Sequence, residues 1–462
     1  MPKEKEVPIQ DFMNTMLAQA IADQASDIHI EPLTQEMRIR FRIDGVMIEK
    51  MRQPIYELGH LSNRIKALAN FDISALSTPQ DGHFLITVYT PITLPSAAPM
   101  PATPPAASLP ESTPASAPKK NLSDTISHLL FDETDKKNPA DASPPGAGAS
   151  QTPSAGQAPP PTPPAPQQLS LRVSIFPTLD GEAIVLRLLN RENMLLPIND
   201  LGMDDQTMVL FKKLIAKDYG MVLITGPAGS GKTTTLYSLL QTLRTKEKNI
   251  VTLEDPVELR LEDIRQSQIY ADHGLTFALG MRSILRQDPD IIMIGEIRDA
   301  DTAENAVRAS LTGRVVLSTI HANTTLGTIP RLIDMNVDRS LIAYALNGVV
   351  AQRLVRKICP NCRINYVPHQ EFLTYFNIKS EDHTFVKGSG CENCRHTGFK
   401  GRTGLFEVLY FDDTVQALII EKAPMKALEE YVATSGIKTL KQDALQKALA
   451  GITTLEEAGK VV

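Results

Sequence analysis

The feature that most constrains the fold is a glycine-rich stretch at residues 226–233, which reads GPAGSGKT and fits the pattern G-x-x-x-x-G-K-[ST]. An apolar run at 221–225 precedes it and a helix-forming run at 234–243 follows it, which predicts a strand, a loop and a helix in that order. Such a loop turns its backbone N–H groups toward phosphate oxygens, while its lysine contacts the outer phosphates and its threonine hydroxyl binds Mg²⁺. An ordinary glycine-rich turn is the alternative, and the flanking elements disfavour it. We therefore predict a nucleoside triphosphate site formed by Gly226, Pro227, Ala228, Gly229, Ser230, Gly231, Lys232, Thr233 and Thr234.

Composition limits the other possibilities. The length of 462 residues predicts two or three domains, and 42% apolar with 22% charged residues is usual for a globular protein. The net charge of −6 does not favour a general nucleic-acid binder. No apolar run is long enough to span a membrane, and the charged N-terminus MPKEKEVPIQ lacks a secretory signal. We expect a cytoplasmic protein that contacts membranes only through partners.

Residues 91–168 differ from the rest of the chain, because they hold 19 of its 33 prolines. Such a segment buries too little apolar surface to offset its ordering entropy, so we expect a disordered insertion. One island within it, residues 121–131, has apolar residues at helical spacing. It is either a transient solvated helix or a short helix that docks on a partner.

The insertion is expected to interrupt a small N-terminal α/β domain. Helical patterns at 9–24 and 55–70 and strand patterns at 27–30, 37–43 and 46–48 precede it, and strand patterns at 169–173 and 183–189 follow it. From about residue 201, strands near 221–225, 249–253, 290–294 and 314–319 alternate with helices, which predicts a doubly wound α/β core. Beyond residue 410 the pattern is helical.

Two of the core strands end in acidic residues. The strand at 249–253 leads to Glu254, Asp255 and Glu258, and the strand at 290–294 leads to Glu296. Because ligands lie at the carboxyl ends of such strands, these acids are predicted near the phosphates. ATP hydrolysis uses one acid to hold Mg²⁺ and another to orient or deprotonate water, but the spacing alone does not say which acid has which role. Surface loop acids are the alternative.

A further buried strand at 314–320 ends at His321. A neutral imidazole at this position can hydrogen-bond the γ-phosphate or relay its loss to a neighbouring subunit. A structural histidine is the alternative.

The four cysteines form two C-x-x-C pairs, Cys359 with Cys362 and Cys391 with Cys394, separated by 28 residues. Four soft ligands predict a closed, tetrahedral structural Zn²⁺ site, worth on the order of 10 kcal/mol to its local fold. Buried reduced cysteines or a redox pair are the alternatives.

Taken together, these motifs resemble the secretion ATPases of type II secretion and type IV pilus assembly, in their extension-motor branch. The resemblance covers nearly all of the chain outside 91–168 and includes ASDIHIEP at 25–32, RIDG at 42–45, PQDG at 79–82, LRQDPD at 285–290 and GEIRD at 295–299. It implies a RecA-like P-loop ATPase core, a smaller N-terminal α/β domain and a zinc-binding subdomain. It also implies a homo-hexamer in which Arg172 and Arg187 reach a nucleotide held by a neighbouring ATPase domain.

By the same resemblance, Glu258 is the water-activating acid and Glu296 belongs to the Mg²⁺ shell with Thr233. ATP, Mg²⁺ and structural Zn²⁺ are the implied cofactors. The chain departs from the family at Arg314, where a second histidine is usual, and at His83, where an arginine is usual. The expected domains are 1–90 with 169–195, the insertion 91–168, the core 196–355, the zinc subdomain 356–410 and the C-terminal helices 411–462.

The resemblance implies a motor that powers assembly of a type IV pilus or a type II secretion pseudopilus, at the inner face of the membrane and through an inner-membrane platform protein. A retraction motor of the same family and a nucleotide-gated scaffold without significant hydrolysis are the alternatives. A DNA-translocating motor is disfavoured by the acidic charge balance.

Overall fold

The computed structural model describes residues 9–88, 167–189 and 194–462. The island at 121–131 and nearly all of the insertion at 91–168 lie outside these residues. Among the described helices, none combines the length and the hydropathy needed to cross a membrane.

The N-terminal part is a six-stranded antiparallel sheet in the order β3-β2-β1-β6-β5-β4. In β2, buried residues such as Phe41 alternate with half-buried arginines, as the sequence pattern predicts for a strand with one face in a core. Two helices pack on the buried face, where Leu17 and Leu61 join the same apolar cluster. The elements are α1 (Ile9–Ala22), β1 (Asp27–Pro32), β2 (Glu36–Ile43), β3 (Val46–Pro54), α2 (Tyr56–Leu68), β4 (Gln80–Val88), β5 (Gln167–Thr178) and β6 (Gly181–Leu189).

The two strands that flank the insertion are neighbours in this sheet. Strand β4 ends at Val88, which is the antiparallel register partner of Gln167 at the start of β5. The described residues on either side of 89–166 therefore belong to one sheet.

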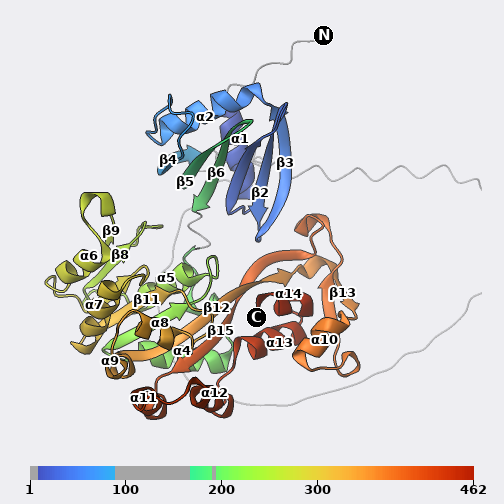
Figure 1. Cartoon of the computed structure of the whole chain (residues 1–462). Coiled ribbons are helices and arrows are strands. Elements are labelled where there is room, and N and C mark those ends of the chain that lie inside the picture. Colours follow the sequence, from blue (N-terminus) through green and yellow to red (C-terminus); the bar gives the residue numbers. More distant parts are fainter. Residues whose placement is uncertain (1–8, 89–166, 190–193) are drawn as a thin grey trace, which may run out of the picture. The chain divides into compact units, whose positions relative to one another are not determined.

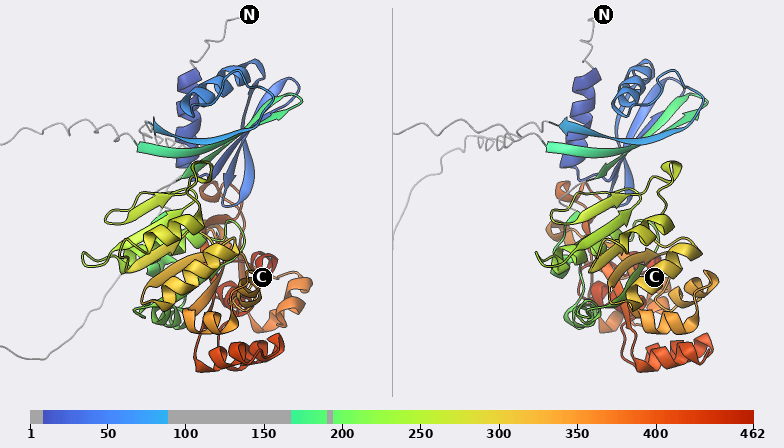
Figure 2. Two further views of the ribbon diagram at one scale, coloured as in Figure 1. Left: turned by 60° about the vertical axis from the view of Figure 1, so that its left-hand side comes forward. Right: turned by 90° about the vertical axis from the view of Figure 1, so that its left-hand side faces the viewer.

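The second sheet has seven strands in the order β15-β12-β7-β11-β10-β8-β9, and β15 alone runs antiparallel to its neighbour. Helices cover both faces (Figures 1 and 2). The strands are β7 (Gly220–Thr225), β8 (Ile250–Glu254), β9 (Arg265–Gln268), β10 (Ile291–Ile294), β11 (Val315–Ile320), β12 (Leu346–Ile358) and β15 (Phe399–Tyr410). The helices along this part of the chain are α4 (Asp205–Ile215), α5 (Lys232–Leu243), α6 (Phe277–Ile284), α7 (Ala300–Leu311), α8 (Thr328–Asp334) and α9 (Arg339–Ala345).

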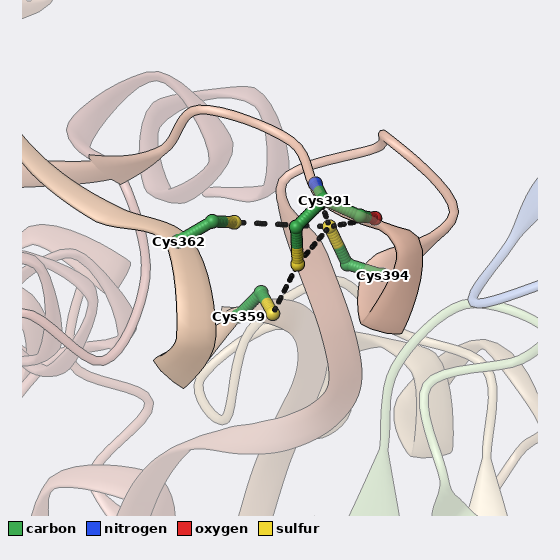
Figure 3. Close-up of side chains that lie close together, drawn as sticks. All are labelled: Cys359, Cys362, Cys391 and Cys394. Atoms are coloured by element: carbon green, nitrogen blue, oxygen red, sulfur yellow. Dashed lines mark hydrogen bonds between the residues drawn. The ribbon is translucent and has the colours of Figure 1, made fainter. Parts of the chain in front are cut away.

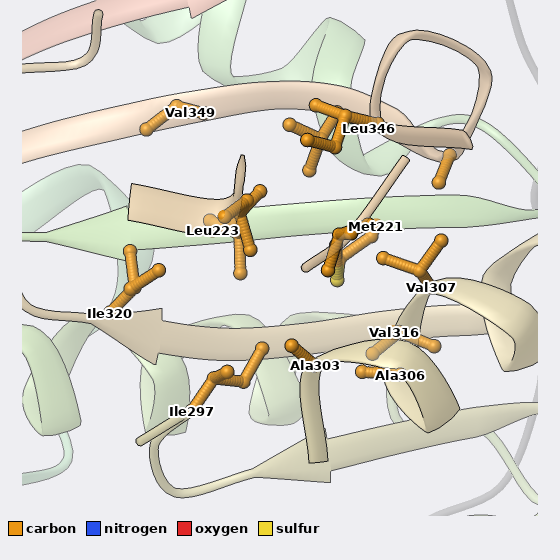
Figure 4. Close-up of a cluster of buried hydrophobic side chains, with 14 of the residues drawn as sticks. Met221, Leu223, Ile297, Ala303, Ala306, Val307, Val316, Ile320, Leu346 and Val349 are labelled. Carbon is orange, nitrogen blue, oxygen red and sulfur yellow. The ribbon is translucent and has the colours of Figure 1, made fainter. Parts of the chain in front are cut away.

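Strand β7 is buried on both faces, which explains its continuous apolar run. Val222 and Ile224 pack toward α4 and α5, whereas Met221 and Leu223 pack toward α7. Figure 4 shows the second of these clusters, in which β7 and β11 contribute side chains that face α7. Each fully buried aliphatic side chain stabilises the fold by about 1.5–3 kcal/mol, so the strand that carries the glycine-rich loop is held rigidly.

Strand β15 lies within the residues that we expect for the zinc subdomain, yet it is hydrogen-bonded to β12 along the edge of the core sheet. The cysteine-bearing segment thus connects two strands of the core. A small hairpin and five helices complete the chain, and Leu405 of β15 packs with Ala444 and Leu455 of the last two helices. These elements are β13 (Arg363–Tyr366), α10 (Gln370–Phe376), β14 (Phe385–Gly388), α11 (Asp413–Ile420), α12 (Met425–Thr434), α13 (Leu440–Leu449) and α14 (Leu455–Val461). Single 3₁₀ turns occur at Ile198–Asp200, Ala271–His273, Pro360–Cys362, Ser380–Asp382 and Glu392–Cys394.

Candidate functional site

The glycine-rich loop connects β7 to α5, as its motif predicts. Gly226 has φ 150°, and a Cβ atom there would lie 2.4 Å from the backbone oxygen of Gln352. Gly231, which precedes α5, has φ 89°, and a Cβ atom there would lie 2.8 Å from Nε2 of the same glutamine. Only glycine fits these two positions, because both the backbone conformation and the neighbouring strand exclude a side chain.

The loop has the donors that a triphosphate needs. Nζ of Lys232 donates to the backbone oxygens of Gly226 at 2.8 Å and Pro227 at 3.0 Å, so its ammonium folds back over the loop. Burial lowers the pKa of Lys232, although the charge of Glu296 raises it. The buried Oγ of Ser230 has no hydrogen-bond partner among the described residues. A bound phosphate would satisfy this hydroxyl and the lysine, so the residues present fit a nucleotide.

A cavity of about 200 Å³ lies beside the loop and brings most of the predicted site residues together. Because β7, β8, β10 and β11 run parallel, their carboxyl ends meet at one edge of the sheet. The cavity is lined by Lys232, Thr233, Leu236, Glu254, Asp255, Pro256, Glu258, Phe277, Met293, Gly295, Glu296, Thr319 and His321. It therefore joins the loop lysine and threonine to both predicted acids and to the predicted histidine.

Glu296 is held by two basic side chains. Its Oε1 accepts a hydrogen bond from Arg298, and its Oε2 lies 3.2 Å from Nε2 of His321. Burial raises the pKa of Glu296, but the contacts with Arg298 and His321 outweigh it and hold the pKa below the usual value. This carboxylate is therefore ionised at neutral pH, which suits a ligand of a divalent cation.

Glu258 has the opposite environment. Its Oε2 is buried and has no hydrogen-bond partner in the described part of the chain. Burial raises the pKa of Glu258 above its usual value, because the charged form loses water without gaining a full set of donors. The two predicted acids thus share one cavity but differ in their affinity for a proton.

Other acids of the same motifs stabilise the structure. Glu254, which we expect near the phosphates, is buried and accepts hydrogen bonds from Tyr237 at 2.5 Å and from Gln266 at 3.0 Å. Asp299 caps α7 by accepting a hydrogen bond from the backbone N–H of Thr302 at 2.8 Å. The motif spacing alone does not separate these structural acids from Glu258 and Glu296.

Arg172 and Arg187 lie on β5 and β6 as direct cross-strand partners. Both are exposed, and Nε of Arg187 donates to Oδ1 of the buried Asp27 at 2.8 Å. The next register partner of Arg172, on β4, is His83. The contribution of the two arginines to the site stays a prediction.

Arg314 lies at the opposite end of β11 from His321. The six residues of β11 separate the two positions, which corresponds to about 23 Å along an extended strand. A second histidine at position 314 is therefore too far away to share the phosphate contacts of His321 in one subunit.

The sequence motifs missed several residues that hold the site together. Oγ1 of Thr225, the residue before the loop, donates to the backbone oxygen of Ala322 at 2.7 Å and accepts from its N–H at 2.9 Å. Oε1 of Gln352 accepts from Thr235 of α5 at 2.8 Å. These contacts join segments about 100 residues apart in the sequence, so no local sequence pattern predicts them.

The four cysteines converge as their spacing predicts (Figure 3). All are free thiols, and their Sγ atoms lie within 4.8 Å of one another. The Sγ atoms of Cys359 and Cys391 are 3.8 Å apart, and those of Cys362 and Cys394 are also 3.8 Å apart. Four thiolates in a tetrahedron around Zn²⁺ would lie about 3.8 Å apart. The cluster therefore has the donor type and the spacing of a structural zinc site.

Backbone groups support this donor set. The N–H of Cys391 and the N–H of Gly398 point to Sγ of Cys394 at 3.2 and 3.3 Å. Burial raises the pKa of Cys394, but these N–H groups outweigh it and lower the pKa to about 6. Burial raises the pKa of Cys362 instead, to about 11, so the four converging Sγ atoms, and not the acidity of the thiols, are what favour a bound cation.

Comparison with known proteins places the chain among secretion proteins. Residues 2–102 and 163–460 match the family of type II/IV secretion system proteins. The chain is 37% identical to the type IV pilus assembly ATPase PilB of Myxococcus xanthus, over 98% of this chain and 67% of that protein. It is 36% identical to the type II secretion system ATPase E of Vibrio cholerae, over 100% of this chain and 76% of that protein.

Solved structures support the fold. The ATPase DotB of Legionella pneumophila superposes with a TM-score of 0.62 at 21% identity, covering 100% of this chain and 97% of that chain. The pilus retraction motor PilT with bound ADP superposes with a TM-score of 0.55 at 22% identity, covering 97% of this chain and 96% of that chain. These likenesses bear out the α/β fold with a RecA-like ATPase core, and the sequence relatives identify the family. The chain belongs to the type II/IV secretion system protein family.

Proposed function

We propose that the protein is a Mg²⁺-dependent ATPase that works as a hexameric motor for assembly of a type IV pilus or a type II secretion pseudopilus. The observation that carries the proposal is the cavity of about 200 Å³ that Lys232, Glu258 and Glu296 line together. The pKa of Glu258 is raised there and the pKa of Glu296 is lowered. Pairs of carboxyl groups that an active site pushes apart in pKa commonly divide the acid–base roles between them. The names of the two sequence relatives, a pilus assembly ATPase and a secretion ATPase, support the direction of the motor.

In the proposed reaction, Lys232 and the N–H groups of the loop hold the β- and γ-phosphates of ATP. Mg²⁺, when bound by Thr233 and Glu296, neutralises phosphate charge. Glu258 accepts a proton from a water molecule whose oxygen attacks the γ-phosphorus. The bond from that phosphorus to the bridging oxygen breaks, and the products are ADP and inorganic phosphate.

His321 lies beside Glu296, and this contact supports a role in which it reports on the γ-phosphate. Arg172 and Arg187 of a neighbouring subunit would stabilise charge in the transition state, which is worth about 10³–10⁵ in rate where arginines act in this way. Hydrolysis would then change how a subunit grips its neighbour. We propose that this motion drives an inner-membrane platform protein from the cytoplasmic side.

The direct test is phosphate release by the purified full-length chain with and without Mg²⁺. The wild type is expected to turn over ATP only with Mg²⁺. Lys232→Ala should abolish turnover while its circular dichroism stays unchanged, and Lys246→Ala, at an exposed lysine outside the cavity, serves as the matched control. Turnover at the wild-type rate in Lys232→Ala would reject the proposed site, and a wild type without turnover would favour the nucleotide-gated scaffold.

The assembly role is tested in cells that depend on this gene for pili or secretion. Lys232→Ala is expected to abolish filament assembly or secretion, and Lys246→Ala to preserve it. If the variant instead accumulates filaments that fail to retract, the retraction motor is the correct function. Deleting 91–168 tests the docking alternative for the island at 121–131: if the island docks on a partner, the deleted chain should leave the membrane fraction, and association that stays intact would reject that alternative.

A further inference from the structure

The segment that follows β11 begins with His321 and continues as an irregular loop to Gly327, before α8 begins at Thr328. His321 and Asn323 are exposed, whereas Thr325 is fully buried. An exposed loop has no regular hydrogen-bond ladder to fix it, so the position of His321 depends on side chains from elsewhere. The first such anchor is Thr225, which exchanges two hydrogen bonds with the backbone of Ala322.

The second anchor is Arg353 on β12. Its Nη2 donates to the backbone oxygen of Asn323 at 2.8 Å, and its Nη1 donates to the backbone oxygen of Gln352 at 3.1 Å. Burial lowers the pKa of Arg353, and nearby Glu407 raises it. A half-buried guanidinium that reaches the loop through one strong contact makes that contact costly to lose.

The third anchor is Glu407 on β15. Its Oε1 accepts hydrogen bonds from both the backbone N–H, at 3.3 Å, and the side-chain hydroxyl of Thr325. Its Oε2 accepts from the N–H of Leu440 at the start of α13, at 3.2 Å. Glu407 is only 8% exposed, so water cannot replace these donors if the loop moves.

The three anchors hold Ala322, Asn323 and Thr325, which lie one, two and four residues beyond His321. Two of the anchors come from β12 and β15, which are neighbours in the sheet (Figure 1). Along the chain, the cysteine-bearing segment connects these two strands. We propose that Arg353 and Glu407 are positioning residues that hold His321 against Glu296. The proposal deepens the proposed function, because it concerns how the same site distinguishes a nucleotide with a γ-phosphate from one without it.

A purely structural role is the alternative, in which the two residues only stabilise the packing of β12 and β15. The positioning role and the structural role differ in whether the effect of a substitution depends on His321. Positioning residues act through His321, so their effect should vanish when His321 is already removed. A structural role would reduce stability and binding in the same proportion with or without His321.

The experiment compares Arg353→Met and Glu407→Gln with two matched controls in the full chain. Arg356→Met lies on the same strand as Arg353 but pairs with Glu457, and Arg402→Met changes an exposed side chain on the same strand as Glu407. Hydrogen exchange of the peptide 321–325 should accelerate at least several-fold in the first two variants and stay at the wild-type rate in both controls. Equal exchange in all four variants would overturn the proposal.

The functional readout is the ratio of affinities for ATP and ADP, measured with fluorescent nucleotides, together with kcat and KM. Arg353→Met and Glu407→Gln should reduce the preference for ATP and lower kcat roughly tenfold, with KM for ATP changed less than about twofold. In a His321→Ala background, each should change these values by less than about twofold. If each substitution lowers kcat by the same factor in the His321→Ala background as in the wild type, the positioning role is rejected.

The two proposals fail separately. If the wild type does not hydrolyse ATP, the proposed function is wrong, but hydrogen exchange and the ratio of affinities still test whether the anchors act through His321. If Glu407→Gln does not fold, Thr325→Val removes one donor to Glu407 and leaves the carboxylate bonded to Leu440. The same acceleration of exchange at 321–325 is then expected, and an unchanged rate would contradict the proposal.

Discussion

Nε2 of His321 lies 3.2 Å from Oε2 of Glu296, so the histidine that follows β11 directly contacts an acid that follows β10. Arg298 binds the other oxygen of the same carboxylate. Glu258, in the same cavity, has an unpartnered buried oxygen among the described residues. The two predicted acids of the cavity therefore differ, because Glu296 is paired with basic side chains and Glu258 is not, and the first two predictions depend on that difference.

Glu258→Gln is expected to stabilise the fold at neutral pH. Because burial raises the pKa of Glu258, the folded state holds its proton more tightly than the unfolded state, and the stability it contributes is lost as pH rises through the raised pKa. The neutral amide has no such loss. Thermal unfolding at pH 8 and pH 4.5 should show a gain in Tm for the variant at pH 8 that shrinks at pH 4.5.

Glu296→Gln serves as the comparison. The pKa of Glu296 is lowered in the folded state, so its contribution to stability is present above the unfolded pKa and is lost as pH falls through the folded value. This variant should lose Tm at pH 8, opposite in sign to Glu258→Gln. The same sign for both variants would refute the contrast between the two acids.

Arg172 is expected to act on the nucleotide of a neighbouring subunit. Arg172→Ala and Lys232→Ala should each be inactive, the first with nucleotide binding preserved. Mixing the two before assembly should restore part of the ATPase activity, since some interfaces then join an intact loop to an intact arginine. Phosphate release over a range of mixing ratios measures this. Mixtures that stay inactive, although exchange of subunits is shown by fluorescence energy transfer, would place the arginine elsewhere.

The cysteine cluster is expected to hold one Zn²⁺ per chain. Mass spectrometry of the native protein and elemental analysis should find it, and Cys362→Ser should lose it. Because zinc contributes on the order of 10 kcal/mol to a small metal-held fold, exchange of amide hydrogens in β13 and β14 should accelerate strongly after chelation. Protection that survives complete removal of zinc would show that the segment folds without metal.

Lys66 and Glu182 form a buried ion pair with Nζ and Oε1 2.6 Å apart, and Lys66 is fully buried. Lys66→Met leaves the carboxylate without its cation, so we expect a loss of about 3–5 kcal/mol in the stability of α2. Lys66→Met with Glu182→Leu should recover most of it. Hydrogen exchange of α2 in the full chain measures both. The exposed pair of Arg308 and Glu304 is the control, where Arg308→Met should cost less than about 1 kcal/mol.

An equal loss in the single and the double variant would show that the Lys66 side chain stabilises α2 by packing. The ion pair would then contribute little to stability, because water would hydrate the Glu182 carboxylate in the Lys66→Met variant.

Local patterns predicted the elements that carry the chemistry. The P-loop follows from one motif and its two flanks, and β7, β8, β10 and β11 lie where apolar runs predict them. The cysteines meet because two C-x-x-C turns already place two thiols each. Such features depend on residues close in sequence, so the sequence alone is enough to predict them.

The tertiary structure decided which residues complete the site. Glu254 and Glu258 belong to one acidic motif, yet the hydrogen bond from Tyr237 makes Glu254 structural. Oε2 of Glu258 is buried without a hydrogen-bond partner among the described residues. Arg353 and Glu407 lie outside every motif, and they reach the histidine loop only because β12 and β15 join the core sheet at its edge.

The sequence by itself therefore determined that this chain has a glycine-rich loop between a strand and a helix, acidic strand ends and four cysteines at metal-binding spacing, because each is encoded within a short window. Only the tertiary structure decided how the acids differ in proton affinity and what fixes His321. Burial and hydrogen bonding to distant strands set both properties, and these depend on the order of strands in the sheet, which no local pattern specifies.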